Sequence, residues 1–260
     1  MHKSGFVNII GNPNVGKSTL MNALVGEKLS IITSKAQTTR HRIMGIVSGE
    51  DFQIVYSDTP GILKPSYKLQ ESMMKFVTGA VTDADVILYV TDTVEQGDRS
   101  AEIIGRIRES GIPTVVVINK IDLSTPEALD ALVDKWRQEL PEAQIVPASA
   151  KENFNIEGLF KTILALLPEG PAFYPKETLT DKTLRFFASE IIREKILKFY
   201  DKEIPYCCEI EIDSYREEPT IDRIAATIYV ARDSQKGILI GHKGEKLKRV
   251  GPVSYTHLRA

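Results

Sequence analysis

The chain has 260 residues, of which 42% are hydrophobic and 26% charged, and its net charge is −2 at pH 7. These values are typical of a globular protein that can form two domains and bury a hydrophobic core. They exclude a basic coat spread over the whole surface, although not a local basic patch. The two cysteines are adjacent, at Cys207 and Cys208, which fits neither a zinc site nor a disulfide framework. The N-terminus lacks a signal peptide pattern and no apolar run has the length of a membrane span, so we expect a cytoplasmic protein.

The first predicted elements are a strand at residues 6–10 and a helix at residues 17–25, joined by a glycine-rich loop. The loop has the spacing G-x-x-x-x-G-K-S, which is typical of a phosphate-binding loop in this strand–loop–helix context. Its glycines let backbone N–H groups point toward phosphate oxygens, and the helix start offers further N–H groups. Lys17 would reach the β- and γ-phosphates, and the Ser18 hydroxyl would bind Mg²⁺. The predicted nucleotide contacts here are Gly11, Asn12, Pro13, Asn14, Val15, Gly16, Lys17, Ser18 and Thr19.

A polar segment at residues 26–42 precedes two predicted strands, at residues 43–47 and 52–56, which a turn joins into a hairpin. The second strand leads into Asp58, Thr59, Pro60 and Gly61. A carboxylate at a strand end beside a phosphate loop can hold Mg²⁺, and Gly61 lets its N–H approach a γ-phosphate. Taken alone, the tetrapeptide would be an ordinary turn, so its assignment to the nucleotide site depends on the loop upstream.

Downstream, apolar runs predict strands at residues 86–91, 114–118 and 144–146, and helical spacing predicts helices at residues 100–110, 127–139 and 156–167. This alternation predicts an α/β fold with a mostly parallel sheet that helices cover on both faces. Ligands of such sheets bind outside the carboxyl ends of the strands, where all the motifs of this half of the chain fall.

Two of these strand ends carry residues that can select guanine. Asp122 can accept from both the ring N–H and the exocyclic amino group of guanine, a donor pair that adenine lacks. Asn119 can bond across the loop and to the base edge, and the stem of Lys120 can cover the ring face. The next loop contains Ser149, Ala150 and Lys151. In it, the small side chain of Ala150 would let its N–H reach the guanine carbonyl. Without the motifs upstream, both would be ordinary strand-end loops.

This ordered set of motifs, in residues 1–168, resembles the translation-factor-related GTPases. The resemblance implies that Thr39, with Thr38 as the alternative, is the switch threonine that contacts Mg²⁺ and the γ-phosphate. We therefore assign Lys17, Thr39 and Gly61 to catalysis, and a Mg²⁺ site to Ser18, Thr39 and Asp58, with GTP and GDP as the ligands.

One position departs from the Ras-like members of that class. Ile62 follows Gly61 where those proteins have a glutamine that orients the attacking water. An isoleucine has no group that orients water, so hydrolysis must use another group or wait for a partner. Relatives with an apolar residue there and an asparagine at the position of Asn14 often recruit a potassium ion, and we hypothesise that Asn14 helps to hold K⁺.

The second half begins after a linker that prolines and a glycine predict at residues 169–182. Apolar side chains at three- and four-residue steps predict a helix at residues 184–199. Two strands are predicted at residues 205–212 and 221–231, with a polar turn at residues 213–220 between them. An apolar turn, a G-x-x-G loop and the start of a basic helix follow.

A G-x-x-G loop in this context can clamp the backbone of single-stranded nucleic acid, because two glycines let it lie close to the phosphates. Between residues 234 and 251, five basic side chains oppose one acidic side chain, which is the charge expected for phosphate contact. The alternative is an ordinary solvated basic helix face. The predicted RNA contacts are Lys236, Gly241, His242, Lys243, Gly244, Lys246 and Lys248.

Both halves together resemble the bacterial GTPases that carry a C-terminal KH domain of type II, on the evidence of residues 37–41, 188–195 and 240–244. The resemblance implies binding near the 3′ end of small-subunit ribosomal RNA, a role in maturing the 30S subunit, and loose association with the inner face of the cell membrane. We expect a monomer. The predicted domains are a GTP-binding domain at residues 1–168, the linker, a partial KH domain at residues 183–251 and an atypical tail at residues 252–260.

The tail is where the sequence departs from that family, which should continue with more helix and a third strand. Residues 252–260 show no helical pattern, so we expect a truncated or foreign end that packs poorly.

The preferred interpretation is a GTP-hydrolysing switch, in which GTP orders residues 36–40 and 58–62, joined to an RNA-binding module. One alternative is an RNA-binding protein whose nucleotide site is structural rather than catalytic, although the presence of Lys17, Ser18, Thr39 and Asp58 speaks against it. Another is a GTPase of tRNA modification, which should lack the G-x-x-G loop.

Overall fold

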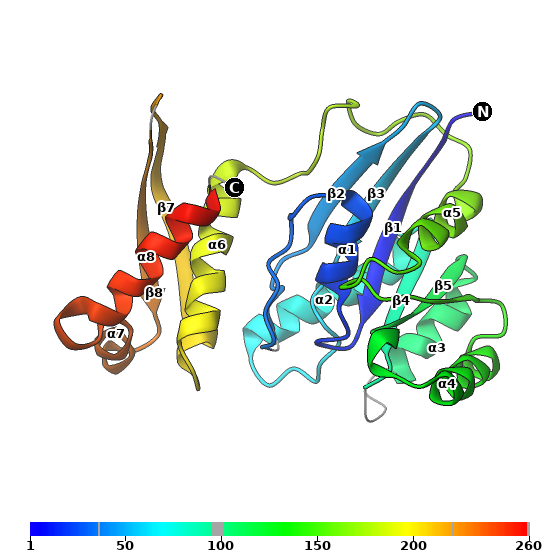
Figure 1. Cartoon of the computed structure of the whole chain (residues 1–260), viewed down its shortest axis with the longest axis horizontal. Helices are drawn as coiled ribbons and strands as arrows, with labels where there is room; N and C mark the ends of the chain where they lie inside the picture. Colours follow the sequence, from blue (N-terminus) through cyan, green and yellow to red (C-terminus); the bar gives the residue numbers. More distant parts are fainter. Residues whose placement is uncertain (36, 95–100, 220, 259–260) are drawn as a thin grey trace. The chain divides into compact units, whose positions relative to one another are not determined.

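The computed structural model describes residues 1–35, 37–94, 101–219 and 221–258, with side chains as far as residue 251. It divides into two compact units (Figure 1). The first comprises Met1–Ser30 and Thr39–Asp181, and the second comprises Ile31–Thr38 and Lys182–Ala260. The domain limits given above stay a prediction.

The first unit is built on a six-stranded sheet with the strand order β2-β3-β1-β4-β5-β6. Its strands are β1 (Lys3–Gly11), β2 (Ile43–Ser48), β3 (Phe52–Asp58), β4 (Val86–Asp92), β5 (Thr114–Asn119) and β6 (Gln144–Pro147). Only β2 pairs in the antiparallel sense, with β3. Every residue of β4 and β5 is buried, as expected for parallel strands covered on both faces. The predicted α/β class and the mostly parallel sheet are confirmed.

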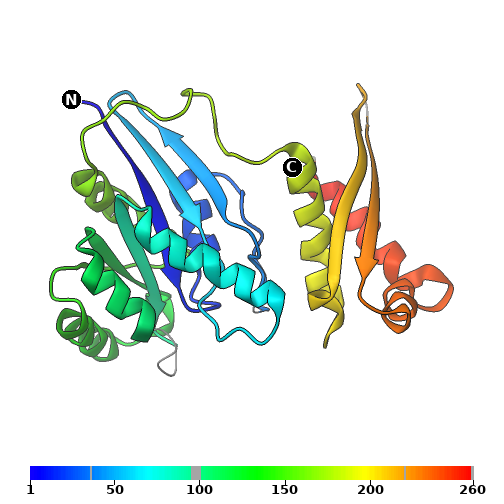
Figure 2. The same ribbon diagram turned by 180° about the vertical axis from the view of Figure 1, so that it is seen from behind.

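Helices α1 (Lys17–Val25) and α5 (Ile156–Leu166) contact each other and lie in front of the sheet in Figure 1. Helices α2 (Lys68–Thr82) and α3 (Ala101–Ser110) lie in front of it in the reverse view (Figure 2). Helices α2, α3 and α4 (Pro126–Glu139) enclose one hydrophobic core. In it, Val77 and Trp136 meet Ile10 and Tyr89 of the sheet.

Helix α2 has no counterpart among the predicted elements. Its buried side chains Met73, Val77, Ala80 and Val81 recur with a helical period, so the signal is present in the sequence. Exposed apolar residues such as Phe76, which is 40% exposed, blur the contrast between the two faces of the helix.

The segment after α5 is held along the edge of the sheet. The N–H of Ile46 in β2 donates to the Leu179 carbonyl at 2.8 Å, and the Thr180 hydroxyl donates to the Met44 carbonyl at 2.7 Å. The side-chain amide of Gln53 bonds the backbone of residues 173–174 in both directions. Residues 169–181 of the predicted linker therefore belong to the first unit as an ordered strap along strands β2 and β3.

The second unit packs helices against a two-stranded antiparallel sheet. Its elements are α6 (Leu184–Phe199), β7 (Cys208–Glu217), β8 (Asp222–Val230), α7 (Asp233–Ile240) and α8 (Glu245–Leu258), with 3₁₀ turns at Ile204–Tyr206 and His242–Gly244. Ile196 and Tyr200 pack with Leu239 and Val250 in its core. The buried Tyr200 hydroxyl donates to the Leu239 carbonyl at 2.6 Å, which satisfies its polar atom.

Three predictions for this unit are wrong. The predicted polar turn at residues 213–220 is mostly strand, because β7 continues to Glu217 through a register shift between Ile212 and Ser214; residue 220 lies outside the described part. The predicted apolar turn is helix α7, in which Leu239 is buried and the Gln235 side chain accepts from the N–H of residue 232 at 2.9 Å.

The third concerns the tail, since α8 runs on to Leu258 where we expected no helix. It passes through Pro252 at the loss of one backbone hydrogen bond, and its first turns are already anchored by the buried Val250. The expected poor packing of residues 252–260 lies outside the side chains that the structure describes.

Among the described residues, no helix combines the length and the apolar character that crossing a membrane requires.

Candidate functional site

The phosphate loop joins β1 to α1 and bends in a way that only glycine permits at two positions. Gly16 has a φ of 97°, and a Cβ on it would lie 2.2 Å from Nδ2 of Asn119. A Cβ on Gly11 would lie 2.1 Å from the carbonyl oxygen of Val90. The two fixed glycines of the motif are therefore required by close contact with the ends of β4 and β5.

Lys17 lies inside the curve of this loop. Its side chain is buried, and Nζ donates to the carbonyl oxygens of Gly11 at 3.0 Å and Asn12 at 2.7 Å. These contacts hold the ammonium group at the start of α1, where the free N–H groups of the helix also point.

Three oxygen-bearing side chains converge next to Lys17. The Ser18 hydroxyl donates to Oδ2 of Asp58 at 2.7 Å, and Oγ1 of Thr39 lies 3.0 Å from Ser18 Oγ and 3.4 Å from Asp58 Oδ2. Of the two threonines considered, Thr39 is the one at this cluster. The hydroxyl of Thr38 donates instead to the Lys35 carbonyl at 2.6 Å.

Asp58 is fully buried, and within the described residues its Oδ1 atom has no hydrogen-bond partner. Burial raises the pKa of Asp58, against the lowering effects of the Ser18 hydrogen bond and the charge of Lys17. A buried carboxylate with one unsatisfied oxygen and two neighbouring hydroxyls is the donor set that a hard divalent cation prefers. The residues predicted for Mg²⁺ therefore fit such an ion.

The segment after Asp58 turns back against the phosphate loop. Thr59 is buried, and its hydroxyl donates to the Ile9 carbonyl at 2.7 Å, so this side chain serves the turn itself. A Cβ on Gly61 would lie 2.8 Å from Cα of Pro13, which explains the glycine. Ile62 is only 3% exposed and belongs to the hydrophobic core. The side chain after the motif thus points away from the phosphate loop.

Asn119 connects three loops at the carboxyl edge of the sheet. Its Nδ2 donates to the Val15 carbonyl at 2.8 Å, and its Oδ1 accepts from the Ala150 N–H at 3.0 Å. The Ala150 N–H, which we predicted for the guanine carbonyl, therefore already has an acceptor within the protein, and its contact with guanine stays a prediction.

The other guanine-loop residues also lie at this edge. Asp122 is exposed, and one of its carboxylate oxygens accepts from the Ser149 hydroxyl at 2.6 Å, which fixes the orientation of the group. Lys151 is exposed and pairs with Glu152 at 3.1 Å. This pairing raises the pKa of Lys151.

Asp92, at the end of β4, is a site residue that was not predicted from the sequence. Its carboxylate is 5% exposed and pairs with Nζ of Lys120, which also donates to the Asn14 carbonyl at 2.6 Å. Asp92 thereby holds the Lys120 stem stretched across the edge to the phosphate loop. The available signal was its position, because it follows a buried strand in the same way as Asp58.

The predicted RNA contacts lie together in the second unit, around the turn between α7 and α8. Gly241 and Gly244 have φ values of 72° and 76°, and Lys243 between them has a φ of 49°. A Cβ on Gly241 would lie 2.8 Å from the Lys246 side chain. The exposed members of the set are Lys236, His242, Lys243, Lys246 and Lys248. The sharp glycine turn therefore presents a cluster of exposed basic side chains.

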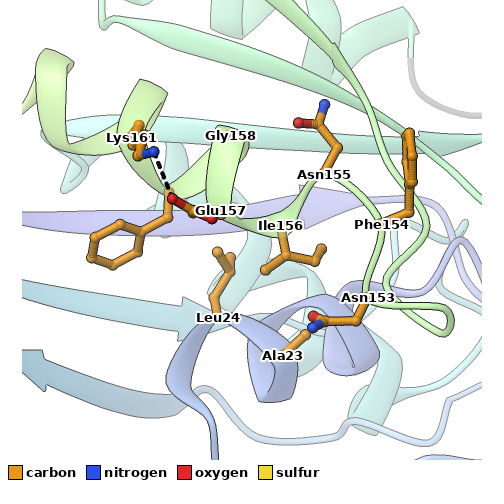
Figure 3. Close-up of a pocket in the computed structure, with 10 residues that line it drawn as sticks. Ala23, Leu24, Asn153, Phe154, Asn155, Ile156, Glu157, Gly158 and Lys161 are labelled. Atoms are coloured by element: carbon orange, nitrogen blue, oxygen red, sulfur yellow. Dashed lines mark ion pairs between the residues drawn. The ribbon is translucent and has the colours of Figure 1, made fainter.

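A separate pocket of about 730 Å³ lies between α1 and the start of α5, bounded by Leu24 and Ile156 (Figure 3). Glu157 and Lys161 form an ion pair at 2.6 Å along its wall. Phe154, also on its wall, exchanges two backbone hydrogen bonds with Ser149. None of the predicted nucleotide contacts lines this pocket.

Comparison with known proteins gives matches over both units. A family model described as "50S ribosome-binding GTPase" matches residues 6–120, and a KH domain model matches residues 203–254. GTPase Era from Staphylococcus haemolyticus is 44% identical over 252 residues, which cover 96% of this chain and 84% of that protein.

Two crystal structures of Era proteins are similar to the whole chain. A point variant of Aquifex aeolicus Era bound to GDP·AlF4⁻ is 39% identical, with a TM-score of 0.93 over 99% of this chain and 89% of that one. An Era in complex with MgGDPNP and nucleotides 1506–1542 of 16S ribosomal RNA is also 39% identical, with a TM-score of 0.94 over 100% of this chain and 89% of that one.

The raised pKa of Asp58 predicts a pH dependence of stability. The folded protein binds this proton more tightly than the unfolded chain, so its stability falls as pH rises from the ordinary carboxyl value of 3.8 through the folded pKa. Asp58→Asn removes this loss while keeping an acceptor for Ser18. In nucleotide-free protein with EDTA, we expect the variant to have the higher free energy of unfolding at neutral pH, and the difference to shrink toward acid.

The measurement is urea denaturation at a series of pH values, with Asp130→Asn, an exposed position on α4, as the control. A difference between unmodified protein and Asp58→Asn that does not change with pH would contradict the expectation.

Proposed function

The chain belongs to the Era family of GTPases, and on this basis we propose that it is a GTP-hydrolysing switch that binds the 3′ end of small-subunit ribosomal RNA and assists maturation of the 30S subunit. The observation that carries the proposal is the convergence of Ser18, Thr39 and Asp58 beside Lys17. The presence of MgGDPNP and of GDP·AlF4⁻ in the two Era structures supports the same ligands here.

In this proposal the triphosphate binds in the phosphate loop. Lys17 exchanges its carbonyl acceptors, Gly11 and Asn12, for phosphate oxygens. Mg²⁺ would be held by Ser18, Thr39 and Asp58, and when bound it neutralises charge on the β- and γ-phosphates. The Gly61 N–H would donate to the γ-phosphate from the turn that packs on Pro13. A diphosphate lacks the group that Thr39 and Gly61 would sense.

Guanine selection in this proposal depends on Asp122, whose carboxylate the Ser149 hydroxyl orients. Two donors of guanine would face that carboxylate, whereas adenine would leave it unpaired. Asn119 and Asp92 support the site by holding the loops and the Lys120 stem in place.

Hydrolysis requires a group other than residue 62 to assist the attacking water, because Ile62 is buried in the core. We propose that a K⁺ ion near Asn14 supplies positive charge there. Asn14 is exposed at the outer turn of the phosphate loop, with a φ of 65°. Such a cation would stabilise charge that develops on the phosphates in the transition state.

The second unit would bind the ribosomal RNA through the turn between α7 and α8. The match to a KH domain and the exposed cations around Gly241 and Gly244 support this role. An Era protein has been crystallised with nucleotides of 16S ribosomal RNA. We also propose that the protein is a cytoplasmic monomer that associates loosely with the inner face of the cell membrane.

GTP would regulate the RNA-binding unit by ordering residues 36–40 and 58–62, of which residue 36 lies outside the described part. Leu179 and Thr180 of the strap bond to β2, which begins four residues after Thr39. A change in residues 36–40, which contain Thr39, would therefore act through β2 on the segment of chain that leads to the second unit. The alternative, an RNA-binding protein with a purely structural nucleotide site, predicts no turnover with or without ribosomal RNA.

Replacing Asp122 tests the nucleotide half of the proposal. Asp122→Ala removes an acceptor that bonds two guanine donors, and a hydrogen bond to a charge contributes about 2 kcal/mol, so GTP affinity should fall about 30-fold or more while ATP affinity stays unchanged. Lys17→Ala should weaken both nucleotides. Calorimetric titration measures this, with Arg106→Ala on α3 as the control. Equal binding of ATP and GTP by the unmodified protein would contradict guanine selection.

The potassium proposal predicts a dependence on the monovalent cation. Steady-state GTP hydrolysis should be faster in KCl than in NaCl at equal ionic strength, on the order of 100-fold, because one preorganised charge on the transition state is lost. Asn14→Ala should remove most of the difference. Equal rates in the two salts would reject the K⁺ site.

The RNA half is tested with an oligonucleotide of the 3′ end of 16S ribosomal RNA. Lys243→Ala should weaken binding and lower the salt dependence of the binding constant by about one unit of slope, since one phosphate contact is lost. Lys161→Ala, an exposed lysine of α5, should change neither. If the salt dependence of RNA binding is the same in Lys243→Ala as in the unmodified protein, Lys243 does not contact the RNA.

A further inference from the structure

We propose that Arg42 is a positioning residue for GTP hydrolysis. Its side chain forms a clamp with Asn8, Ser57 and Asp83, in which Arg42 and Ser57 flank the two segments, residues 36–40 and 58–62, that are expected to respond to the γ-phosphate. The inference rests on the proposed function and deepens it, because it names what holds those segments in register with the site.

The guanidinium of Arg42 uses three nitrogen atoms. Nη2 donates to Asn8 Oδ1 at 2.9 Å and to Asp83 Oδ1 at 3.2 Å, Nη1 donates to the other Asp83 oxygen, and Nε donates to the Ser57 hydroxyl. Asn8 is fully buried, and its Nδ2 donates to the Ala80 carbonyl at 2.8 Å and to Asp83 at 2.6 Å. Each of the four side chains therefore contacts at least one other by a directed hydrogen bond.

The clamp joins four places in the first unit. Asn8 and Ser57 are paired neighbours on β1 and β3, and Ser57 directly precedes the buried carboxylate Asp58. Asp83 follows the last residue of α2. Arg42 follows Thr39 by three residues and directly precedes β2. Strands β1 and β3 thus serve as a rigid frame for the chain just after Thr39 and for the end of helix α2.

Fixing these ends reduces the conformations from which the site must be assembled. Only two residues separate Thr39 from Arg42, so the anchored guanidinium limits how far the threonine hydroxyl can move from Ser18 and Asp58. The entropic cost of ordering a segment falls when one of its ends is already held. Without the clamp, part of that cost would be met when a triphosphate is bound and the remainder on reaching the transition state.

An exposed ion pair alone contributes little to stability, so charge attraction is not the main effect. The side chain of Arg42 is 16% exposed and that of Asp83 is 51% exposed. What distinguishes the clamp is its geometry. Arg42 donates to Asp83 through two nitrogens, and it also donates to the buried amide of Asn8 on β1 and to the hydroxyl of Ser57 on β3. Lysine cannot reproduce this fork.

The experiment compares Arg42→Ala, Arg42→Lys and Asp83→Asn with the unmodified protein. We expect Arg42→Ala to lower kcat for GTP by about 10- to 100-fold, as loss of supporting contacts behind metal ligands commonly does. Affinity for a non-hydrolysable GTP analogue should fall, with a higher Mg²⁺ requirement, while GDP affinity stays within about twofold, because GDP has no γ-phosphate to order these segments. Arg42→Lys should restore little, and Asp83→Asn should have an intermediate effect.

Arg106→Ala is the matched control, because Arg106 also pairs with a carboxylate at 3.0 Å but lies on α3 outside the clamp. The proposal is overturned if GTP-analogue and GDP affinities fall together, or if kcat is unchanged. If Arg42→Ala does not fold, Asp83→Asn decides by the same ratio of affinities. Failure of the unmodified protein to hydrolyse GTP would instead refute the proposed function, whereas the ratio of triphosphate to diphosphate affinity tests the clamp alone.

Discussion

The amide of Asn119 donates to the Val15 carbonyl and accepts from the Ala150 N–H, so one buried side chain holds the phosphate loop and the loop after β6 against the end of β5. This contact dictates neighbouring sequence, because Gly16 has no room for a Cβ beside the same amide. Asp92 and Lys120 form a second bridge to the phosphate loop at Asn14. The proposed nucleotide site is therefore a set of loops cross-linked by polar side chains at one edge of a sheet.

Burial of Asp58 shows how chemistry and stability oppose each other at that edge. A carboxylate without full hydrogen bonding destabilises the fold, which is why its pKa is raised. A cation bound there would offset this cost, and the site would then couple ligand binding to folding stability. At Ile62 the side chain favours stability instead, because it contributes to the hydrophobic core. In the proposed mechanism another group must orient the water.

Strong local patterns allowed most of the fold to be predicted from sequence. The glycine spacing around Gly16 is typical of one strand–loop–helix arrangement. The short, continuous apolar runs of β4 and β5 are typical of buried parallel strands. Helix α2 was missed because exposed apolar residues blur its period, and α7 because its short apolar run is equally compatible with a turn. The position of Asp92 after a buried strand was a local signal, but its partners, like those of Arg42, depend on which strands become neighbours, and nothing local in the sequence encodes that.

The ordered strap at residues 169–181 has a consequence for solubility. Strand β2 lies at the border of the sheet, and strands in that position present unpaired N–H and C=O groups that can recruit another chain. By occupying groups on Met44 and Ile46, the strap leaves less of that border available for intermolecular pairing. Substitutions in the strap would therefore promote self-association even where every residue that touches the nucleotide is intact.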